Sequence, residues 1–203
     1  MKPTDILKNE HRVIEQVLDC LDAMTDSCQR DGRIAEEPAR QAIDFLRTFA
    51  DTCHHGKEEN QLFPMMESRG YSPVAGPTAV MRAEHTQGRS LIRAMEVEIP
   101  AASTGDEAAR TKWMTAARDY SFLLRQHIDK EDECLFPMAD QALRDADQVE
   151  LGRQFERVEH DEIGPGVHDK YLQLADALAD RFGVRKNRVP AAGKQCGCSG
   201  HQH

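Results

Sequence analysis

The sequence predicts an all-α fold, in which an up-down-up-down four-helix bundle is followed by an additional C-terminal helical segment and a flexible tail. Apolar residues recur every three or four positions through long segments, as on the buried face of a helix. Aromatic residues make up only 5% of the chain and β-branched residues are few, which disfavours a large sheet. Motifs of the first half return in the second half, as expected for two helical hairpins of one design.

Four long helices are expected in order along the chain. The first opens with Thr4 as its N-cap and ends near Asp31-Gly32, where glycine suits a helix end. Proline lacks the amide hydrogen that a helical hydrogen bond requires, so the third helix should stop before Pro100. The second, third and fourth helices are predicted at residues 36–68, 77–98 and 107–146, with a loop at 101–106.

A fifth helix is expected from about Val149 to Phe182. Gly164-Pro165-Gly166 should break it, because proline lacks an amide donor and clashes with the preceding turn. The tail beyond it contains Cys196 and Cys198, which suit metal capture or thiol chemistry as well as a plain disordered end. The chain is thus divided into a bundle at 1–146, C-terminal helices packed on it at 147–183, and a flexible tail at 184–203.

The internal repeat is the most informative pattern. Glu10-His11 returns as Glu84-His85 at an offset of 74 residues. The segment from His54 to Pro64, His-His-Gly-Lys-Glu followed by Leu-Phe-Pro, returns from His127 as His-Ile-Asp-Lys-Glu and Leu-Phe-Pro at an offset of 73. On the second helix, His55 with Glu59 has the same four-residue spacing as His54 with Glu58. Only His54/Glu58 and His127/Glu131 match each other under the offset, so these are the preferred pairs.

These residue types and spacings predict a dinuclear metal site. A four-residue step on a helix turns about 400° and rises about 6 Å, so both side chains leave from one face. Inward histidines and carboxylates from four helices are a recurrent way to hold two ions, and a nitrogen-rich set suits iron, although zinc and other first-row metals would also bind. A lone helical histidine is usually a surface residue, but the matched contexts favour ligands. The predicted set is His11, His54, Glu58, His85, His127 and Glu131.

The residues between these ligands have simpler interpretations. The Leu-Phe-Pro triplets are expected to pack beside the ligands, to bend the helices and to exclude water. Lys57 and Lys130 are expected to be exposed, with their stems lying along the surface.

These motifs resemble the hemerythrin-like, or HHE cation-binding, family over about residues 5–138. The resemblance implies an up-down-up-down bundle with two non-haem irons joined by carboxylates and an oxo or hydroxo bridge. It implies that the first helix supplies His11, the second His54 and Glu58, the third His85, and the fourth His127 and Glu131. The bridging carboxylates would then be Glu58 and Glu131.

The sequence differs at two positions from the oxygen carriers of that family. Arg89 stands where they have a histidine four residues after the third-helix ligand, and their fourth-helix carboxylate would correspond to Asp132. The site is therefore expected to be one terminal ligand short. His55 could fill the gap, and so could His160 if the fifth helix packs against the bundle. Glu10 and Glu84 are candidate acceptors for the ring N–H groups of the ligands.

The leading functional hypothesis is a protein that binds or senses dioxygen, nitric oxide or peroxide at an open iron position. The first alternative is a stress-defence enzyme, an oxidoreductase that reduces peroxide or nitric oxide or repairs iron–sulfur centres with the help of a redox partner. The second is an iron store or donor that hands metal on through its Cys-Gly-Cys tail.

Composition narrows the expected partners. The net charge of −9 and the absence of a long basic cluster argue against a nucleic acid. There is no run of eighteen apolar residues and no apolar segment of signal-peptide type after Met1, so we expect no membrane partner and a cytoplasmic protein. In that compartment the six cysteines are expected to be thiols.

Overall fold

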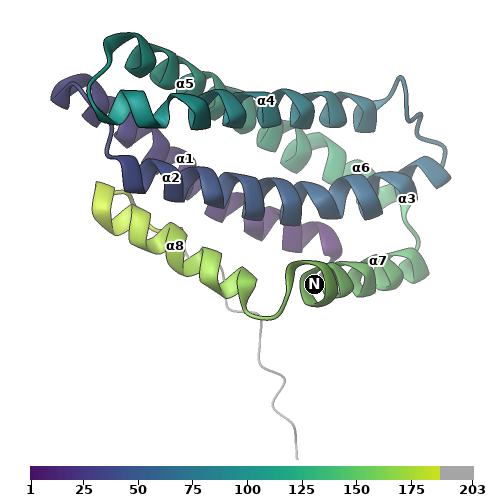
Figure 1. Cartoon of the computed structure of the whole chain (residues 1–203). Coiled ribbons are helices and arrows are strands. Elements are labelled where there is room, and N and C mark those ends of the chain that lie inside the picture. The colour runs from purple at the N-terminus through teal and green to yellow at the C-terminus, as the bar shows by residue number, and fades with distance from the viewer. Residues whose placement is uncertain (188–203) are drawn as a thin grey trace, which may run out of the picture.

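The computed structural model describes residues 1–187, except for the side chains of residues 162 and 163, and every regular element in this part of the chain is helical. Figure 1 shows long helical segments side by side, with a shorter pair of helices along one face. The first and third long segments are α1 (Pro3–Asp31) and α4 (Pro77–Ser103). The second consists of α2 (Glu36–Phe45), η1 (Leu46–His55), η2 (Glu58–Leu62) and α3 (Phe63–Ser68). The fourth consists of α5 (Glu107–Lys130), η3 (Glu131–Leu135) and α6 (Phe136–Ala142).

Two helix ends differ from the expectation. The N-cap of α1 is Lys2 rather than Thr4, and Thr4 instead donates to Asp140 at 2.8 Å. The helix α4 continues through Pro100 to Ser103, so the predicted stop there was wrong. Proline removes only its own amide bond, and the buried side chains of Ile99 and Ala102 hold this last turn in the core.

The predicted fourth helix was too long. It ends at Ala142, and Leu143 takes an extended conformation that places its side chain among buried apolar residues. A new helix, α7 (Asp145–Arg157), begins directly afterwards. Its start is capped by Asp147, whose carboxylate accepts the Arg144 amide at 2.9 Å. Burial of Leu143 together with this cap ends the fourth segment four residues early.

The C-terminal helices cover one side of the long segments. After α7 come η4 (Val158–Ile163) and α8 (Val167–Phe182), and the predicted break at Gly164–Gly166 is confirmed by positive φ angles at both glycines. The helix α7 contacts α1 and η2, whereas α8 contacts α1 and α2. The first tail residues are also placed, since the Asn187 amide donates to Gln16 at 2.6 Å. Cys196 and Cys198 lie outside the described residues.

The helices carry π-helical turns at matching places in the two halves. In η2 and η3 the amides of Phe63 and Phe136 bond to the carbonyls of Glu58 and Glu131, five residues back. A proline follows each of these phenylalanines, and a proline ring clashes with the carbonyl four residues before it. The widened turn relieves that clash, which gives the Leu-Phe-Pro triplets their structural role.

The apolar core is divided in two by a polar layer. One cluster includes Leu18, Phe45 and Trp113, and the other includes Leu7, Phe63 and Phe136. Along α1, Leu7 belongs to the second cluster and Ile14 to the first, with His11 between them. The third long segment repeats this order, and the second and fourth reverse it. The buried polar residues of the layer thus have apolar side chains above and below them.

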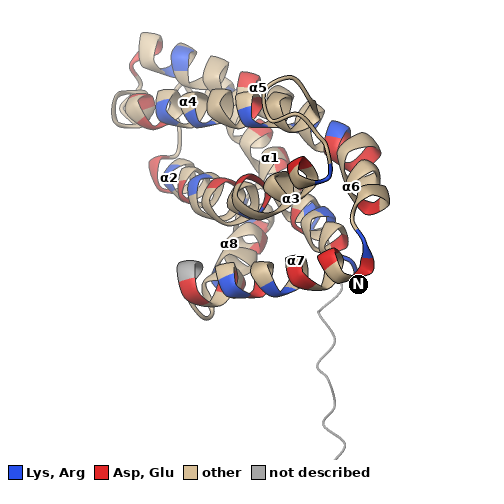
Figure 2. Cartoon of the chain, turned by 90° about the vertical axis from the view of Figure 1, so that its right-hand side faces the viewer, with Lys and Arg blue, Asp and Glu red and all other residues tan. Residues whose placement is uncertain are grey.

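Charged residues of both signs are interspersed on the helices in Figure 2. No helix in the described part of the chain is long and apolar enough to cross a membrane.

Candidate metal centre

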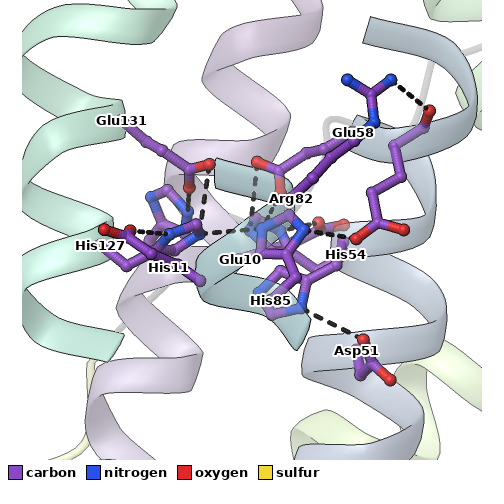
Figure 3. Close-up of polar contacts among 12 residues, drawn as sticks. Glu10, His11, Asp51, His54, Glu58, Arg82, His85, His127 and Glu131 are labelled. Atoms are coloured by element: carbon purple, nitrogen blue, oxygen red, sulfur yellow. Dashed lines mark hydrogen bonds and ion pairs between the residues drawn. The ribbon is translucent and has the colours of Figure 1, made fainter. Parts of the chain in front are cut away.

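The polar layer brings together seven buried potential ligands from all four long segments (Figure 3). They form two groups of four, and within each group one ligand atom per residue lies within 4.8 Å of the others. One group is His11, His54, Glu58 and Glu131, and the other is His55, Glu58, His85 and His127. The two groups share Glu58, so the layer contains two adjacent positions for a cation with a common carboxylate.

Both carboxylates face both groups. One oxygen of Glu131 lies 3.2 Å from His11 Nε2, and the other lies 3.2 Å from His127 Nε2. The two oxygens of Glu58 lie 3.5 Å from His54 Nε2 and 3.5 Å from His85 Nε2. Each carboxylate can therefore donate one oxygen to each position, which is the arrangement of a bridging ligand.

The inward-facing atoms of this layer lack hydrogen-bond partners. Buried polar atoms are nearly always paired, because an unpaired one costs about 1–3 kcal/mol. His85 Nε2 and His127 Nε2 face each other at 3.1 Å, an unfavourable contact of two lone pairs unless a proton or a cation lies between them. The donor set therefore fits a pair of cations. The unpaired atoms are the Nε2 atoms of His11, His54 and His55 and both carboxylate oxygens of Glu58 and Glu131.

The outer nitrogen of each clustered imidazole contacts a carboxylate. An N–H bond from Nδ1 fixes the tautomer in which Nε2 carries the free lone pair, and it also fixes the orientation of the ring. The Nδ1–oxygen pairs are His11–Asp132 at 2.8 Å, His54–Glu10 at 2.9 Å, His55–Asp51 at 3.4 Å, His85–Glu59 at 2.7 Å and His127–Glu84 at 3.0 Å.

Basic side chains neutralise these outer carboxylates. Arg89 bonds both Asp51 and Glu59 at 2.8 Å, which explains what this residue does in place of a histidine ligand. Lys57, expected at the surface, is instead completely buried, because it bonds Glu10 and Glu159. The other pairs are Arg12 with Asp132 and Lys130, which is 43% exposed as expected, with Glu84.

The charges within the layer are strongly coupled. Burial and the neighbouring Glu131 carboxylate raise the pKa of Glu58 well above its usual range. Burial also acts to raise the pKa of Glu131, but His127 and His11 hold it well below its usual range. Burial opposes the charged form of His127, yet Glu131 and Glu84 raise its pKa to about 9. Without metal, protons must supply the positive charge that this carboxylate pair requires.

Two additional histidines were candidates for the gap left by Arg89. His55 lies within the cluster, with its ring stacked on that of His85 at 3.8 Å between centroids. The layer therefore holds five imidazoles, and His55 is placed where it could supply the ligand that was expected to be missing. His160 does not join it, because its side chain is 78% exposed and bonds Asp161 on the solvent side of η4.

Two of the five carboxylates that bond the outer ring nitrogens were predicted from the sequence. Glu10 and Glu84 accept ring N–H bonds as expected. Asp51, Glu59 and Asp132 were missed as acceptors. Asp51 precedes His55 by four residues, a signal that was present in the sequence. The partners of Glu59 and Asp132 lie on other helices, so spacing could not reveal them.

A small cavity lies beside the three-imidazole group, between α4 and α5. It measures about 10 Å³, close to the room that one water molecule needs. His55, His85 and His127 line it together with Tyr120 and Leu124.

Two overlapping His/Glu groups in the core of a helical protein are typical of cation-binding helical bundles. The model of the Hemerythrin HHE cation binding domain matches residues 2–139, which include all seven clustered residues. The chain therefore belongs to the hemerythrin HHE cation-binding family.

Two sets of relatives show how far the similarity extends. The chain is 24% identical over 178 residues to the uncharacterized proteins Rv1995 of Mycobacterium tuberculosis and Mb2018 of Mycobacterium bovis, covering 88% of this chain and 68% of theirs. It is 34% identical over 91 residues to the iron-sulfur cluster repair protein YtfE of Cronobacter sakazakii, covering 43% of this chain and 41% of that protein. No solved structure matches the chain.

Proposed function

We propose that the four long segments form an up-down-up-down bundle that holds a non-haem di-iron centre. His11 and His54 would bind one iron, His55, His85 and His127 the other, and Glu58 and Glu131 would bridge them. The observation that carries this proposal is the pair of overlapping ligand groups that share Glu58. The unpaired inward atoms of this layer support it, because two cations would satisfy all of them.

The ligand count favours a role in binding a small molecule. With one oxygen from each bridge, an iron beside His11 and His54 would have four protein ligands, whereas the other would have five. First-row ions accept up to about six ligands, so the first position retains the larger opening. Iron there supplies a redox-active Lewis acid with room for dioxygen, nitric oxide or peroxide. The apolar clusters on both sides exclude bulk water and larger ligands from this layer.

The direct test is to measure iron per purified chain and to follow the optical spectrum. We expect about two irons, near-ultraviolet bands of a bridged ferric pair, and changes when the anaerobically reduced protein meets air, peroxide or nitric oxide. Zinc alone, or no bound metal in a folded chain, would refute the di-iron proposal. An oxygen adduct that persists for hours would indicate a carrier in place of a sensor.

Similarity to YtfE favours repair of iron–sulfur clusters in stress defence as the second candidate function. Reduction of nitric oxide or peroxide with electrons from a redox partner is the enzymatic form of the same role. Several turnovers per chain with an added reductant, or restored activity of an iron–sulfur enzyme damaged by nitric oxide, would support it. A strictly stoichiometric reaction and no repair would leave ligand binding as the function.

A further inference from the structure

The two halves of the protein share a repeated outer arrangement around one histidine each. In the first half, His54 Nδ1 bonds one oxygen of Glu10 at 2.9 Å, and Lys57 bonds the other oxygen. The lysine stands three residues after the histidine, whereas the glutamate comes from another helix, α1. The ring of His54 is thereby linked to a buried ammonium group through one carboxylate.

The second half repeats this arrangement residue by residue. His127 Nδ1 bonds one oxygen of Glu84 at 3.0 Å, and Lys130 bonds the other. The internal repeat thus includes the outer partners as well as the ligands. His127, Glu84 and Lys130 consequently provide matched controls for His54, Glu10 and Lys57.

The halves differ in what covers the lysine. Lys130 is 43% exposed, whereas Lys57 is completely buried. Glu159 of η4 lies over Lys57 and contacts its Nζ at 2.5 Å, and the Phe155 ring of α7 lies 5.9 Å from the same atom. Both covering residues come after residue 139, where the match to the family domain ends. The C-terminal segment therefore makes two otherwise similar halves unequal.

Charge explains why this contact matters. An ion pair inside a protein is screened far less than one in water, so the Lys57 pairs should restrain their partners more strongly than the exposed Lys130 pair does. Glu10, Cys53, Glu159 and His168 also lie close enough together to suggest a separate cation site. Lys57 already places an ammonium group on both carboxylates of that group, so it is the cation of this cluster.

We propose that Glu159 is a positioning residue for one half of the metal centre, acting through Lys57 and Glu10 on the ring of His54. The C-terminal segment thereby holds the iron beside His11 and His54 more firmly than the bundle alone would. This inference rests on the proposed di-iron centre and adds a role for the region outside the family domain.

The test compares iron release from the full-length, iron-loaded protein and its variants in the presence of a chelator. Loss of a residue that bonds a metal-bound histidine directly typically lowers affinity about 10–100-fold, which is the effect expected of Glu10→Gln. Glu159→Gln acts through Lys57 and Glu10, so it should speed the loss of one iron by at most about tenfold and leave the other unchanged. Glu159→Gln combined with Glu10→Gln should be non-additive, because both act on His54. Glu159→Gln combined with Glu84→Gln should be additive, because the latter acts on His127.

Unchanged iron release in Glu159→Gln, or additivity with Glu10→Gln, would overturn the proposal. The Glu159 side chain is 36% exposed, so the variant is expected to fold. Glu159→Asp, which keeps the charge, is the second variant and should release iron at an intermediate rate.

A nuclear magnetic resonance measurement on the metal-free full chain separates this inference from the di-iron proposal. The Nδ1 proton resonance of His54 should shift in Glu159→Gln, and that of His127 should not. Wild-type protein without iron would refute the di-iron centre alone. If the resonances of both histidines stay unchanged, the positioning role of Glu159 is refuted, whatever the metal content of the protein.

Discussion

At the scale of single residues, each clustered imidazole has one nitrogen free for a cation and the other bound to a carboxylate. The five acceptors come from different parts of the chain, yet each occupies the same place relative to its ring. Fixing the tautomer in advance removes a cost that metal binding would otherwise include. The two inner carboxylates have no such partners, so their charge is balanced only by the imidazoles or by bound cations.

Replacement of Glu131 tests the bridge. Glu131→Gln keeps the size of the side chain but removes its charge and one oxygen donor. Loss of a direct ligand should cost more than the about 10–100-fold typical of an outer partner, and iron per chain should fall to one or less by elemental analysis. Glu133→Gln, an exposed position two residues away, is the control and should keep both irons. Two irons with an unchanged spectrum in Glu131→Gln would contradict a bridging role.

At the scale of elements, the helices depart from regular α-helical geometry next to the layer of clustered histidines and glutamates. The π-helical turns η2 and η3 begin at Glu58 and Glu131, and the prolines that cause these two turns follow in the same register of each half. The helices α4 and α5 leave the small cavity between them. Gly88 of α4 lines this cavity opposite Tyr120, and a Cβ built on it would lie 3.5 Å from Tyr120 Cε2, an ordinary contact.

Gly88→Ala should separate stability from ligand access. Alanine is favoured over glycine within a helix by about 1 kcal/mol, so the variant should be more stable by up to that amount. Its methyl group narrows the cavity beside His55, His85 and His127, so nitric oxide that reaches the centre through this cavity should bind to the reduced protein more slowly in stopped-flow measurements. Gly152→Ala in α7, where a Cβ meets nothing within 4 Å, should gain stability without slowing binding. Equal binding rates in both variants would show that the ligand takes another route.

At the scale of the whole molecule, two apolar clusters are joined through a polar layer that crosses all four long segments. This layer contains carboxylates and imidazoles whose inward atoms are unpaired, so it lowers the stability of the metal-free core. Bound cations would convert it into a cross-link between the helices. Stability and metal content are therefore expected to be coupled.

Removal of metal tests that coupling. A ligand that binds only the folded state at about a thousand times its dissociation constant adds about 4 kcal/mol, which corresponds to a Tm shift of about 10 °C for a chain of this size. Dialysis against a chelator should lower the Tm of the wild-type protein by about this amount, and added ferrous iron should restore it. Glu58→Gln, which removes the shared ligand, should respond much less. A Tm that does not depend on metal would show that the layer is stable by itself.

The sequence by itself determined the helical class, the repeated halves and the inner histidines and glutamates. These features depend on local spacing: an apolar stripe identifies a helix, and a four-residue step places two ligands on one face. The same reasoning placed Glu10 and Glu84 beside the ligands, because the repeat doubled their signal. It was wrong about the helix ends at Pro100 and Leu143, where burial of neighbouring side chains outweighed local propensity.

Only the tertiary structure decided which residues face each other across helices. His55, which follows His54, joins the cluster, whereas His160 of the Glu159-His160 pair does not, although the sequence offered both as candidates for the missing ligand. Lys57 and Lys130 have equivalent sequence contexts, yet one is buried and the other is exposed, because Phe155 and Glu159 of the C-terminal segment lie over Lys57. Contacts between distant segments depend on how complete helices pack together, and no local pattern of residues contains that information.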